Sequence, residues 1–475
     1  MTVLLINTNQ MQPPIAPIGL DYIAGSLQAS GIQAEVLDLC LTDKPNEILK
    51  SYFANNNPEL VAMTFRNIDD CFWPSAQWFV PQLNNFIEKI RIASNSPIVI
   101  GGIGFSILPK QILQYTGADY GIRGDGEQAL VQLAQQLRGS CELEKVPGLL
   151  WQEQGQIREN KPSWPDELKL PVNRDAIDNK TYFQRGGQIG LETKRGCNRK
   201  CIYCADPLAK GNKLRLRKPE DIADEVECLL NQSINVFHLC DAEFNIPISH
   251  AKAVCQEFIR HGFGEKIKWY TYMAVTPFDE ELIKLMKKAG CSGIDFTGDS
   301  ASTLMLQTYR QPHVKEDLAR AVGLCKENKI KIMVDLLLGS PGETKEILAE
   351  TIGFMKQIGP DCIGAGLGVR IYPQTQMEHI VKKEGTLENN PSLKRKYDGS
   401  VDFFKPTFYI SHLLGEKPAE LISNLIGSDE RFFKPTPESA RQATDHNYND
   451  NTELLKAIES GARGAYWDIL SSGRK

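Results

Sequence analysis

Apolar and polar positions alternate in blocks over the first stretch of about 135 residues, and the blocks predict strands and helices in turn. Five short apolar runs have the length of buried strands: 3–7, 34–39, 60–65, 97–102 and 119–124. The segments between these runs, of which 18–30 is the first, carry apolar residues at helical spacing. This alternation predicts a doubly wound domain, in which helices cover both faces of a parallel sheet.

A second series of apolar runs begins near residue 189: 190–195, 236–241, 267–273, 293–298, 332–339 and 364–373. About six strand–helix units in this length predict a partial parallel barrel, with catalytic groups at the carboxyl ends of its strands. Between the two series the rhythm is lost, and the chain is rich in Pro, Asn and Gln, which indicates a hairpin and a linker. The tail is first polar and then helical in pattern.

The predicted fold class is therefore α/β, in four regions. A doubly wound, Rossmann-like domain is expected at 1–138, followed by the linker and hairpin at 139–188. A partial barrel of six strand–helix units is expected at 189–384. A mainly helical region that caps the substrate is expected at 385–475.

The composition is that of a soluble globular protein, with 41% hydrophobic and 24% charged residues. No apolar stretch approaches the ~20 residues that a membrane span needs, and the N-terminus lacks the basic region of a signal peptide. The net charge of −5 gives no overall attraction to nucleic acid. We therefore expect a cytoplasmic protein whose twelve cysteines serve metal sites or the core rather than disulfides.

Three of these cysteines form a tight group in RGCNRKCIYCADP, directly after the first barrel strand. Cys197, Cys201 and Cys204 have the spacing C-x3-C-x2-C, and thiolates are soft ligands that suit iron–sulfur clusters and zinc. A structural zinc site normally has four protein ligands, and no fourth cysteine or histidine lies nearby in the sequence. Three ligands on a four-iron cluster leave one iron open to a small molecule, so we predict a [4Fe–4S] cluster here.

This spacing in this place resembles the defining motif of the radical S-adenosylmethionine superfamily. In that family the open iron binds the amino and carboxylate groups of S-adenosylmethionine, and an electron from the cluster cleaves it to a 5′-deoxyadenosyl radical. The resemblance implies that Tyr203 packs near the adenine. It also implies that Asp241 or Glu243, after the second barrel strand, meets the ammonium of the methionine, although either one can instead cap the next helix.

Later strand ends extend the resemblance, in the expected order, as far as residue 380. FTGDS places Asp299 and Ser300 where relatives touch the ribose or the methionine, with an aspartate in place of their commoner glutamate. LLLGSPGET follows the fifth strand and places Gly339 where the backbone is implied to approach the adenosine closely. GVRIYPQTQM matches the sixth strand and its turn.

The N-terminal domain resembles the cobalamin-binding domain that precedes the barrel in a methyltransferase-like subclass of this superfamily. The matching segments are PIGLDYIAGSLQASG, VAMTFRNIDD, GGIGFSILP and GIRGDGEQAL. The resemblance implies that Gly101, Gly102 and Gly104 admit the corrin ring or its nucleotide tail. All seven histidines lie outside this domain, so cobalamin would have no histidine as its lower ligand.

Arg66, at the tip of the third strand, is the candidate to face the cobalt from below. The alternatives are an exposed residue at a helix entry and an ion-pair partner of Asp69 or Asp70. On the third barrel strand, Tyr270 and Tyr272 alternate with Thr271, so we expect one or both to reach the barrel interior.

The leading hypothesis is a cobalamin-dependent radical methyltransferase that acts on a small natural-product intermediate. One alternative is a cobalamin-free radical enzyme that abstracts hydrogen from a polyol or aminoglycoside and eliminates water. A non-catalytic iron–sulfur carrier or sensor is the other, and the ordered barrel turns argue against it. A flavodoxin or ferredoxin is expected as reductant, steered by nine basic residues between Lys194 and Lys218, unless these form only a solvated face.

Overall fold

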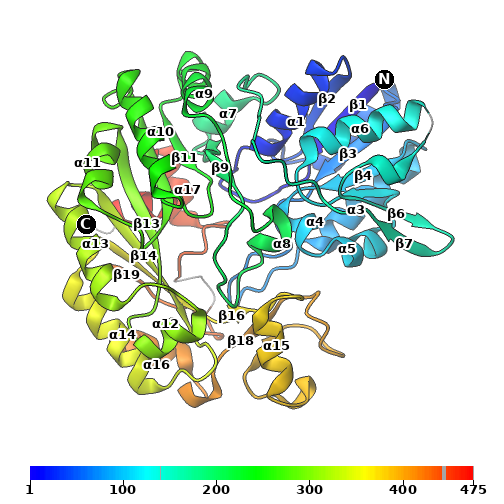
Figure 1. Ribbon diagram of the computed structural model, residues 1–475. Coiled ribbons are helices and arrows are strands. Elements are labelled where there is room, and N and C mark those ends of the chain that lie inside the picture. The colour runs from blue at the N-terminus through cyan, green and yellow to red at the C-terminus, as the bar shows by residue number, and fades with distance from the viewer. Residues whose placement is uncertain (140, 441–444, 474–475) are drawn as a thin grey trace.

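Two seven-stranded sheets lie side by side in the computed structural model, which describes residues 1–139, 141–440 and 445–473 (Figure 1). The N-terminal sheet is coloured blue to cyan, and the second sheet is built from the middle of the chain. Within these described ranges, no helix is both long and apolar enough to cross a membrane.

The first sheet has the strand order β2-β1-β3-β4-β5-β6-β7, and β1 to β5 run parallel. Its strands are β1 (Thr2–Asn7), β2 (Gln33–Asp38), β3 (Leu60–Thr64), β4 (Ile98–Gly101), β5 (Tyr120–Ile122), β6 (Leu149–Glu153) and β7 (Gln156–Glu159). Its helices are α1 (Ile18–Ala29), α2 (Pro45–Asn55), α3 (Val80–Ala93), α4 (Ile103–Ile107), α5 (Pro109–Thr116) and α6 (Gly126–Arg138).

Alternate residues of β1 enter different cores, which explains its uninterrupted apolar run. Leu5 packs into the core with α1 and α6, whereas Leu4 and Ile6 pack into the core with α2, α3 and α5. A strand covered by helices on both faces is apolar at every position. The predicted doubly wound domain is therefore confirmed.

The β6–β7 hairpin falls within the region predicted as linker and hairpin, and it extends the first sheet through antiparallel pairing with β5. The chain then crosses to α7 (Asn179–Gln184) and enters the barrel. The boundary at residue 138 stays a prediction, and the structure adds that the sheet itself continues to Glu159.

The second sheet is parallel throughout and has the order β19-β15-β14-β13-β12-β11-β8. Its strands are β8 (Gly190–Leu191), β11 (Val236–Leu239), β12 (Lys268–Ala274), β13 (Cys291–Asp299), β14 (Lys331–Leu338), β15 (Cys362–Leu367) and β19 (Phe432–Phe433). The helices around it are α9 (Pro219–Asn231), α10 (Ile248–Arg260), α11 (Glu280–Lys288), α13 (Lys315–Glu327), α14 (Lys345–Ile358) and α16 (Pro418–Ile426). The first six strands coincide with the six predicted runs and confirm the partial barrel.

The two faces of the barrel sheet differ in exposure. On β12, Trp269 is fully buried and packs against Phe258 of α10 on the outer face. Tyr272 points to the opposite, concave face and is 41% exposed, although β12 lies in the middle of the sheet. Tyr270 lies on the same face and donates a hydrogen bond to Asp468 at 2.9 Å. Both tyrosines therefore reach the barrel interior.

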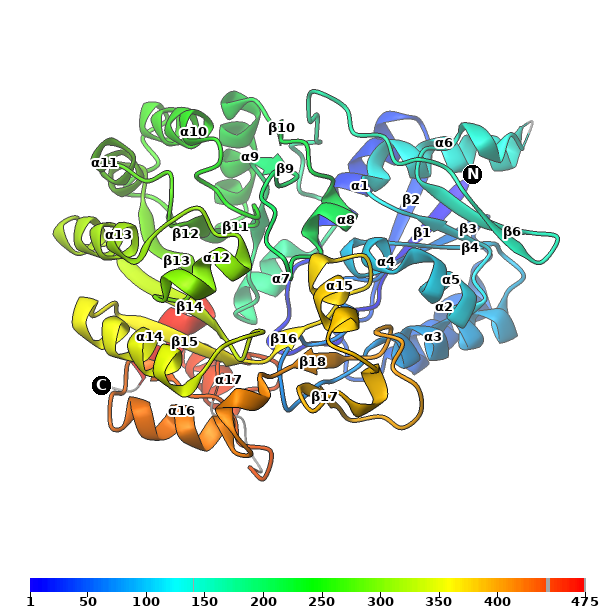
Figure 2. The ribbon, with the colours of Figure 1, turned by 60° about the horizontal axis from the view of Figure 1, so that its bottom comes forward.

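The C-terminal region contributes strands as well as the helices that were predicted for it. β17 (Leu393–Arg395) and β18 (Thr407–Tyr409) form a small sheet with β16 (Val369–Arg370), and β19 joins the barrel sheet. Strands of two or three residues are stabilised by tertiary pairing and leave little pattern in a sequence. Figure 2 shows the small sheet and α15 (Gln376–Lys383) between the two large sheets.

The last helix closes the amino-terminal end of the barrel. In α18 (Tyr466–Ser472), Trp467 packs edge-on against Tyr270, and Asp468 pairs with Lys331 at the start of β14. The remaining elements are β9 (Lys194–Arg195), β10 (Arg215–Leu216), α8 (Asp206–Lys210), α12 (Thr303–Tyr309) and α17 (Thr452–Glu459), with short 3-10 helices at 143–145, 387–389 and 412–414. The opposite, carboxyl end of the barrel is left for the cysteine loop.

A buried ionic network around Arg174 of the linker joins the two domains. Its guanidinium donates to Asp21 of α1 at 2.7 Å and to Glu225 of α9 at 2.8 Å, and all three side chains are 0% exposed. Tyr22 and Arg217 also donate to Glu225, at 2.9 Å and 2.6 Å. The charges compensate one another only when the domains are assembled.

Replacing Arg174 with methionine is expected to lower the free energy of unfolding by about 3–5 kcal/mol, because buried Asp21 would lose its cation and buried Glu225 would keep only Arg217. Denaturant unfolding measures the change. The control is Arg158→Met, whose exposed pair with Glu153 should contribute at most about 1 kcal/mol. Equal losses in the two variants would contradict a role for the network in holding the domains together.

Candidate active site

The cysteine loop leaves β9 at Gly196 and is held by the β9–β10 hairpin. Gly196 has φ +86°, and a Cβ at this position would lie 2.1 Å from the carbonyl oxygen of Lys213. Only glycine fits this close approach, so the residue before the first cysteine is determined by the backbone. The Cys197 amide donates to the carbonyl of Gly211 at 3.2 Å, which fixes the start of the loop.

The three thiols of the loop are free and partly to fully buried. Burial raises the pKa of Cys197 and Cys204, and burial, Asp299 and Cys197 together raise the pKa of Cys201 to about 12. Such thiols need the positive charge of a metal to bind as thiolates. Among the described residues, no three His, Cys, Asp or Glu side chains converge on a single-ion site. In an iron–sulfur cluster each thiolate binds a different iron, so its ligands do not converge on one ion.

Tyr203 and Asp299 lie together beside the cysteines. The Tyr203 hydroxyl donates to Asp299 at 2.8 Å, and Gln311 joins them by donating to the same carboxylate at 2.5 Å. Gln311 also lies 3.5 Å from the sulfur of Cys201. Burial raises the pKa of Asp299 to about 6, against the hydrogen bonds from Tyr203 and Gln311. Gln311 follows α12 outside any motif, so no signal in the sequence indicated it.

Asp241 and Glu243, which the sequence could not distinguish, have different environments. The Asp241 carboxylate accepts the backbone amides of Thr193 at 2.8 Å and Lys194 at 3.2 Å, and also accepts the Thr193 hydroxyl. It is 2% exposed, so it fixes the strand that leads into the cysteine loop. Its oxygens are occupied within the protein, and it acts on the site through the backbone.

Glu243 instead keeps a free oxygen beside the cysteines. Its Oε1 accepts from Thr297 at 3.1 Å, whereas its buried Oε2 has no partner among the described residues. Burial raises the pKa of Glu243 to about 7, and its charge in turn raises the pKa of Cys197 and Cys201. The buried ammonium of Lys194, close enough to oppose that shift, is likewise unpartnered in the described structure. The free anion can bind the amino group of a methionine, and the free cation can bind its carboxylate.

Ser300 and Gly339 also lie near these strand ends, but their polar groups are occupied. The Ser300 hydroxyl is fully buried and shares a hydrogen bond of 2.9 Å with Thr351 of α14. The Gly339 amide donates to the Glu343 carboxylate, and its carbonyl accepts the Ser411 amide at 2.7 Å. Ser300 can therefore hydrogen-bond a cofactor only if its bond to Thr351 breaks. Gly339 can contact a cofactor by packing but not by hydrogen bonds.

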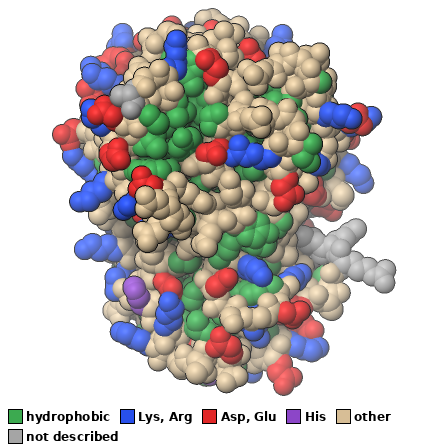
Figure 3. Space-filling view, turned by 90° about the vertical axis from the view of Figure 1, so that its right-hand side faces the viewer, with side chains coloured by type: hydrophobic (Ala, Val, Ile, Leu, Met, Phe, Trp, Pro, Cys, Tyr) green, Lys and Arg blue, Asp and Glu red, His purple; other side chains and the backbone are tan. Residues whose placement is uncertain are grey.

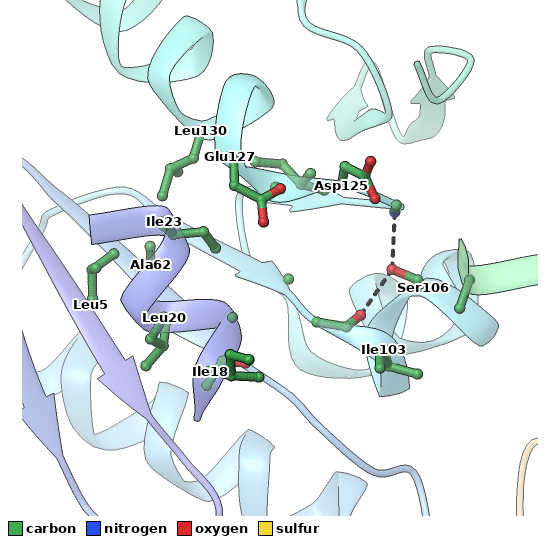
Figure 4. A pocket seen from close by; sticks show the side chains of 18 of the residues that line it. Leu5, Ile18, Leu20, Ile23, Ala62, Ile103, Ser106, Asp125, Glu127 and Leu130 are labelled. Atoms are coloured by element: carbon green, nitrogen blue, oxygen red, sulfur yellow. Dashed lines mark hydrogen bonds between the residues drawn. The ribbon is translucent and has the colours of Figure 1, made fainter. Parts of the chain in front are cut away.

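A largely apolar pocket of about 930 Å³, including its open mouth, lies at the carboxyl edge of the first sheet (Figure 4). It opens between β1 and β3, where the strand order reverses, and α1 and α6 form its walls. Ligands bind at this position in doubly wound sheets. Gly19 and Gly101 line it, and a Cβ at Gly101 would meet nothing nearer than 4.0 Å. The two glycines thus keep open a cradle that side chains would fill.

Gly102 and Gly104 shape the turn beside this pocket. Gly102 has φ +102°, and a Cβ there would lie 2.6 Å from the carbonyl oxygen of Phe65. The Gly104 amide donates to that same carbonyl at 3.0 Å. Ser106 donates to the Gly102 carbonyl at 2.9 Å and accepts the Gly124 amide at 3.0 Å (Figure 4). Gly102 lines the pocket, whereas Gly104 supports the loop that follows β3.

Arg66 is exposed and lies in a polar pocket with Asn9, Gln10 and Asn67. Its guanidinium is 3.9 Å from the sulfur of Met11. It does not pair with the neighbouring aspartates, since Asp69 binds Arg370 at 2.8 Å and Asp70 accepts from Ser75, the Gln77 amide and Asn447. Burial raises the pKa of Tyr272 in the barrel and the charge of Arg66 opposes that rise, so the two side chains lie near each other across the space between the domains.

Four of the nine basic residues between Lys194 and Lys218 are buried, namely Lys194, Arg195, Arg215 and Arg217. Arg195 pairs with Glu127 and Glu192, Arg215 with Asp125, and Arg217 with Glu225, and all three arginines are at most 8% exposed. The pairs with Glu127 and Asp125 bind the segments on either side of the cysteine loop to the N-terminal domain. On the face turned toward the viewer in Figure 3, positive and negative side chains are interspersed. The expected basic docking rim therefore excludes these buried residues, whereas Lys200, Lys213 and Lys218 are exposed.

Two family models match the chain: the radical SAM superfamily over residues 191–355 and the B12 binding domain over residues 5–134. They coincide with the barrel and with the doubly wound domain. The two domains that were recognised by resemblance are confirmed.

The chain is similar over its whole length to the radical S-adenosylmethionine methyltransferase TsrM from Kitasatospora setae. The sequences are 30% identical, the match covers 100% of this chain and 99% of that one, and the TM-score is 0.91. That structure contains tryptophan substrate and an S-adenosylmethionine analogue, and a second structure of TsrM contains cobalamin and a [4Fe–4S] cluster. The tryptophan 2-C-methyltransferase of Streptomyces laurentii is 29% identical over 98% of this chain and 95% of its own length.

These relatives confirm the predicted cofactors, which are a [4Fe–4S] cluster, S-adenosylmethionine and cobalamin. They favour the methyltransferase over a cobalamin-free dehydratase and over a non-catalytic carrier. The substrate is a small molecule. The chain belongs to the cobalamin-dependent radical S-adenosylmethionine methyltransferases.

Proposed function

We propose that this enzyme methylates a carbon atom of an aromatic amine, with tryptophan as the first compound to test. The full-length similarity to two proteins that are described with tryptophan supports the proposal. The observation that carries it is a set of aromatic rings on the concave face of the barrel, where a flat substrate can stack.

These rings come from three parts of the chain. Tyr272 of β12 lies beside His238 of β11, with ring centroids 4.8 Å apart. Phe72, from the N-terminal domain, packs edge-on against His446 at 5.1 Å, and Tyr448 lies 6.1 Å from the same ring. The rings thus surround the space between barrel and N-terminal domain, next to the cysteine loop and Arg66.

We assign the cofactors to residues as follows. Cys197, Cys201 and Cys204 hold the cluster, and the Tyr203–Asp299 pair lies next to S-adenosylmethionine. Glu243 directs its free oxygen, oriented by Thr297, to the open iron or to the ammonium of the methionine, and Lys194 meets the carboxylate. Cobalamin would be held in the cradle at Gly101 and Gly102, and Arg66 is the residue that would face it. When bound, S-adenosylmethionine supplies the methyl group, cobalamin carries it and the cluster supplies electrons.

The protein's own groups position these cofactors and keep water out. Asp241 fixes the strand before the cysteine loop, and Arg195 ties the following residues to the N-terminal domain through Glu127. Phe72 and His446 close the space from the two sides of the domain interface. The carbon that gains a methyl group must lose a hydrogen. A space without water protects the reactive groups from side reactions during this exchange.

For the physiological reductant we propose a flavodoxin or ferredoxin that docks near the cysteine loop, where Lys200 remains exposed. A reducing cytoplasm is the proposed location, and the twelve free cysteines support it. Both proposals are independent of the identity of the methyl acceptor.

Anaerobic reconstitution with iron, sulfide and hydroxocobalamin tests the proposed reaction. With tryptophan and S-adenosylmethionine carrying a deuterated methyl group, we expect a methylated product whose mass includes that label. The label must appear on carbon, as judged by fragmentation and NMR. A holoenzyme with both cofactors that methylates no aromatic amine would contradict the proposal, and methylation on nitrogen alone would contradict its carbon acceptor.

A further inference from the structure

Two aspartates on neighbouring strands share the concave face of the barrel. Asp295 of β13 pairs in register with Met333 of β14, and Thr297 pairs with Asp335. Residues two apart on a strand lie on the same face, so Asp295 and Asp335 are diagonal neighbours. The intervening residue Phe296 packs against Phe278 on the outer face, so the aspartates point inward.

The two carboxylates lack the partners that buried charges normally have. Asp295 is 4% exposed, and neither a hydrogen bond nor a cation offsets the rise of its pKa on burial. The Oδ1 atom of Asp335 is buried without a hydrogen bond, and the Nε2 atom of His446 lies 3.3 Å from it. A buried carboxylate without donors destabilises the protein that contains it, so its retention points to a ligand.

The electrostatic surroundings favour a cation at this place. Burial, then Asp335 and then Glu243, raises the pKa of Asp295 well above its usual range. Of these carboxylates, Asp335 has only His446 to lower its pKa. A cation between Asp295 and Asp335 would reverse the repulsion and restore both groups to their charged form.

Asp335 contacts His446, yet it remains partly exposed on the concave face beside Tyr272. On β15, a Cβ at Gly364 would lie 2.2 Å from Oδ1 of Asp335 and 2.7 Å from the His446 ring, so only glycine lets these two meet. Asp335 keeps 37% of its side chain exposed and Tyr272 keeps 41%, both on the concave face of central strands. The phenol of Tyr272 therefore lies beside the acidic pair.

We infer that Asp295 and Asp335 bind the ammonium group of the substrate. An ammonium has three donors and no acceptor, which matches two carboxylates that have acceptors free. The inference rests on the proposed function and deepens it. The methyl acceptor is a primary amine or amino acid whose ring stacks on the aromatic wall, and a carboxylic acid without an amine is rejected.

Affinities of the cofactor-loaded protein for two matched pairs of probes test this inference. Tryptamine and 3-indolepropionate share a ring and differ in charge, and n-butylamine and butyrate repeat the comparison without a ring. The variants are Asp295→Asn and Asp335→Asn, with Asp398→Asn as the control because Asp398 is exposed. Calorimetry measures binding, and thermal melting of the substrate-free proteins reports any structural role.

The wild type should bind tryptamine at least about tenfold more tightly than 3-indolepropionate. Each asparagine variant at the pair should weaken tryptamine about 10–100-fold and leave 3-indolepropionate unchanged or tighter. The melting temperature of these variants should stay or rise, since repulsion is relieved. Asp398→Asn should bind like the wild type.

Equal affinity of the wild type for amine and acid, or equal weakening of both by the variants, would overturn the inference. So would a fall of the melting temperature in both variants, which would make the pair structural. If neither indole binds but n-butylamine is preferred over butyrate and the variants remove that preference, the aromatic substrate is wrong and the ammonium site stands. If tryptophan is methylated but no amine is preferred over its matched acid, the aromatic substrate stands and the ammonium site is wrong.

Discussion

A Cys201→Ala variant is expected to lose the iron–sulfur cluster and all methyl transfer, while the chain remains folded. Cys201 is one of three thiols on a loop that offers no replacement ligand, and a four-iron cluster with two protein ligands is not retained. The near-ultraviolet and visible absorbance of the reconstituted protein, its iron content and the labelled-methyl assay measure the loss. Activity should fall by at least about 1000-fold, so that no product is detected in the assay.

The control for this variant is Cys228→Ala, because Cys228 is a free, half-buried cysteine on α9 away from the loop. It should keep the full iron content and full activity. Loss of the cluster in Cys228→Ala, or turnover in a Cys201→Ala protein freed of adventitious iron, would make the assignment of the three thiols wrong.

The second large effect is expected from Gly101→Leu. The side chain would enter the pocket at the carboxyl edge of the first sheet, where the nearest protein atom to a new Cβ is 4.0 Å away. The fold can therefore accept the substitution, since leucine suits a strand better than glycine, but the cavity is filled. Cobalamin affinity should fall by about 100-fold or more, with the cluster retained. Corrin absorbance after desalting and iron content distinguish the two cofactors.

Gly353→Leu on the outer helix α14 is the matched control, because a Cβ there meets nothing within 4 Å and the position is exposed. It should retain cobalamin and slightly stabilise the helix. Normal cobalamin binding by Gly101→Leu would place the cofactor elsewhere. A protein that holds the cluster and loses methyl transfer with the corrin would show that the two sites act together.

Much of the fold could be predicted from local patterns. The runs at 3–7 and 60–65 became β1 and β3 because both faces of the first sheet are covered, so that every position is apolar. The six barrel runs were found because their outward-facing residues are buried under helices, although their inward-facing residues include polar ones such as Tyr272 and Asp335. The two- and three-residue strands β17, β18 and β19 were not found, since pairing with distant segments and not propensity forms them.

The sequence pattern could not predict the role of a residue whose partner lies in another segment of the chain. Asp241 and Glu243 have the same chemistry and lie two positions apart. Only the fold shows that Thr193 occupies the first and that the second keeps an oxygen free. The basic run resembled an exposed surface. However, Arg195, Arg215 and Arg217 are buried in ion pairs with Glu127, Asp125 and Glu225.

The three cysteines, with their spacing of three and two residues, are a local arrangement, and the sequence by itself determined them, the cofactors that they imply and the order of the two domains. Ligands on one loop need no tertiary contacts to be recognised. The tertiary structure alone brought together Asp295, Asp335 and His446, which lie on two strands and a C-terminal segment, around a space lined by rings from both domains. Substrate choice depends on such convergence of distant residues, and that is why no linear motif expresses it.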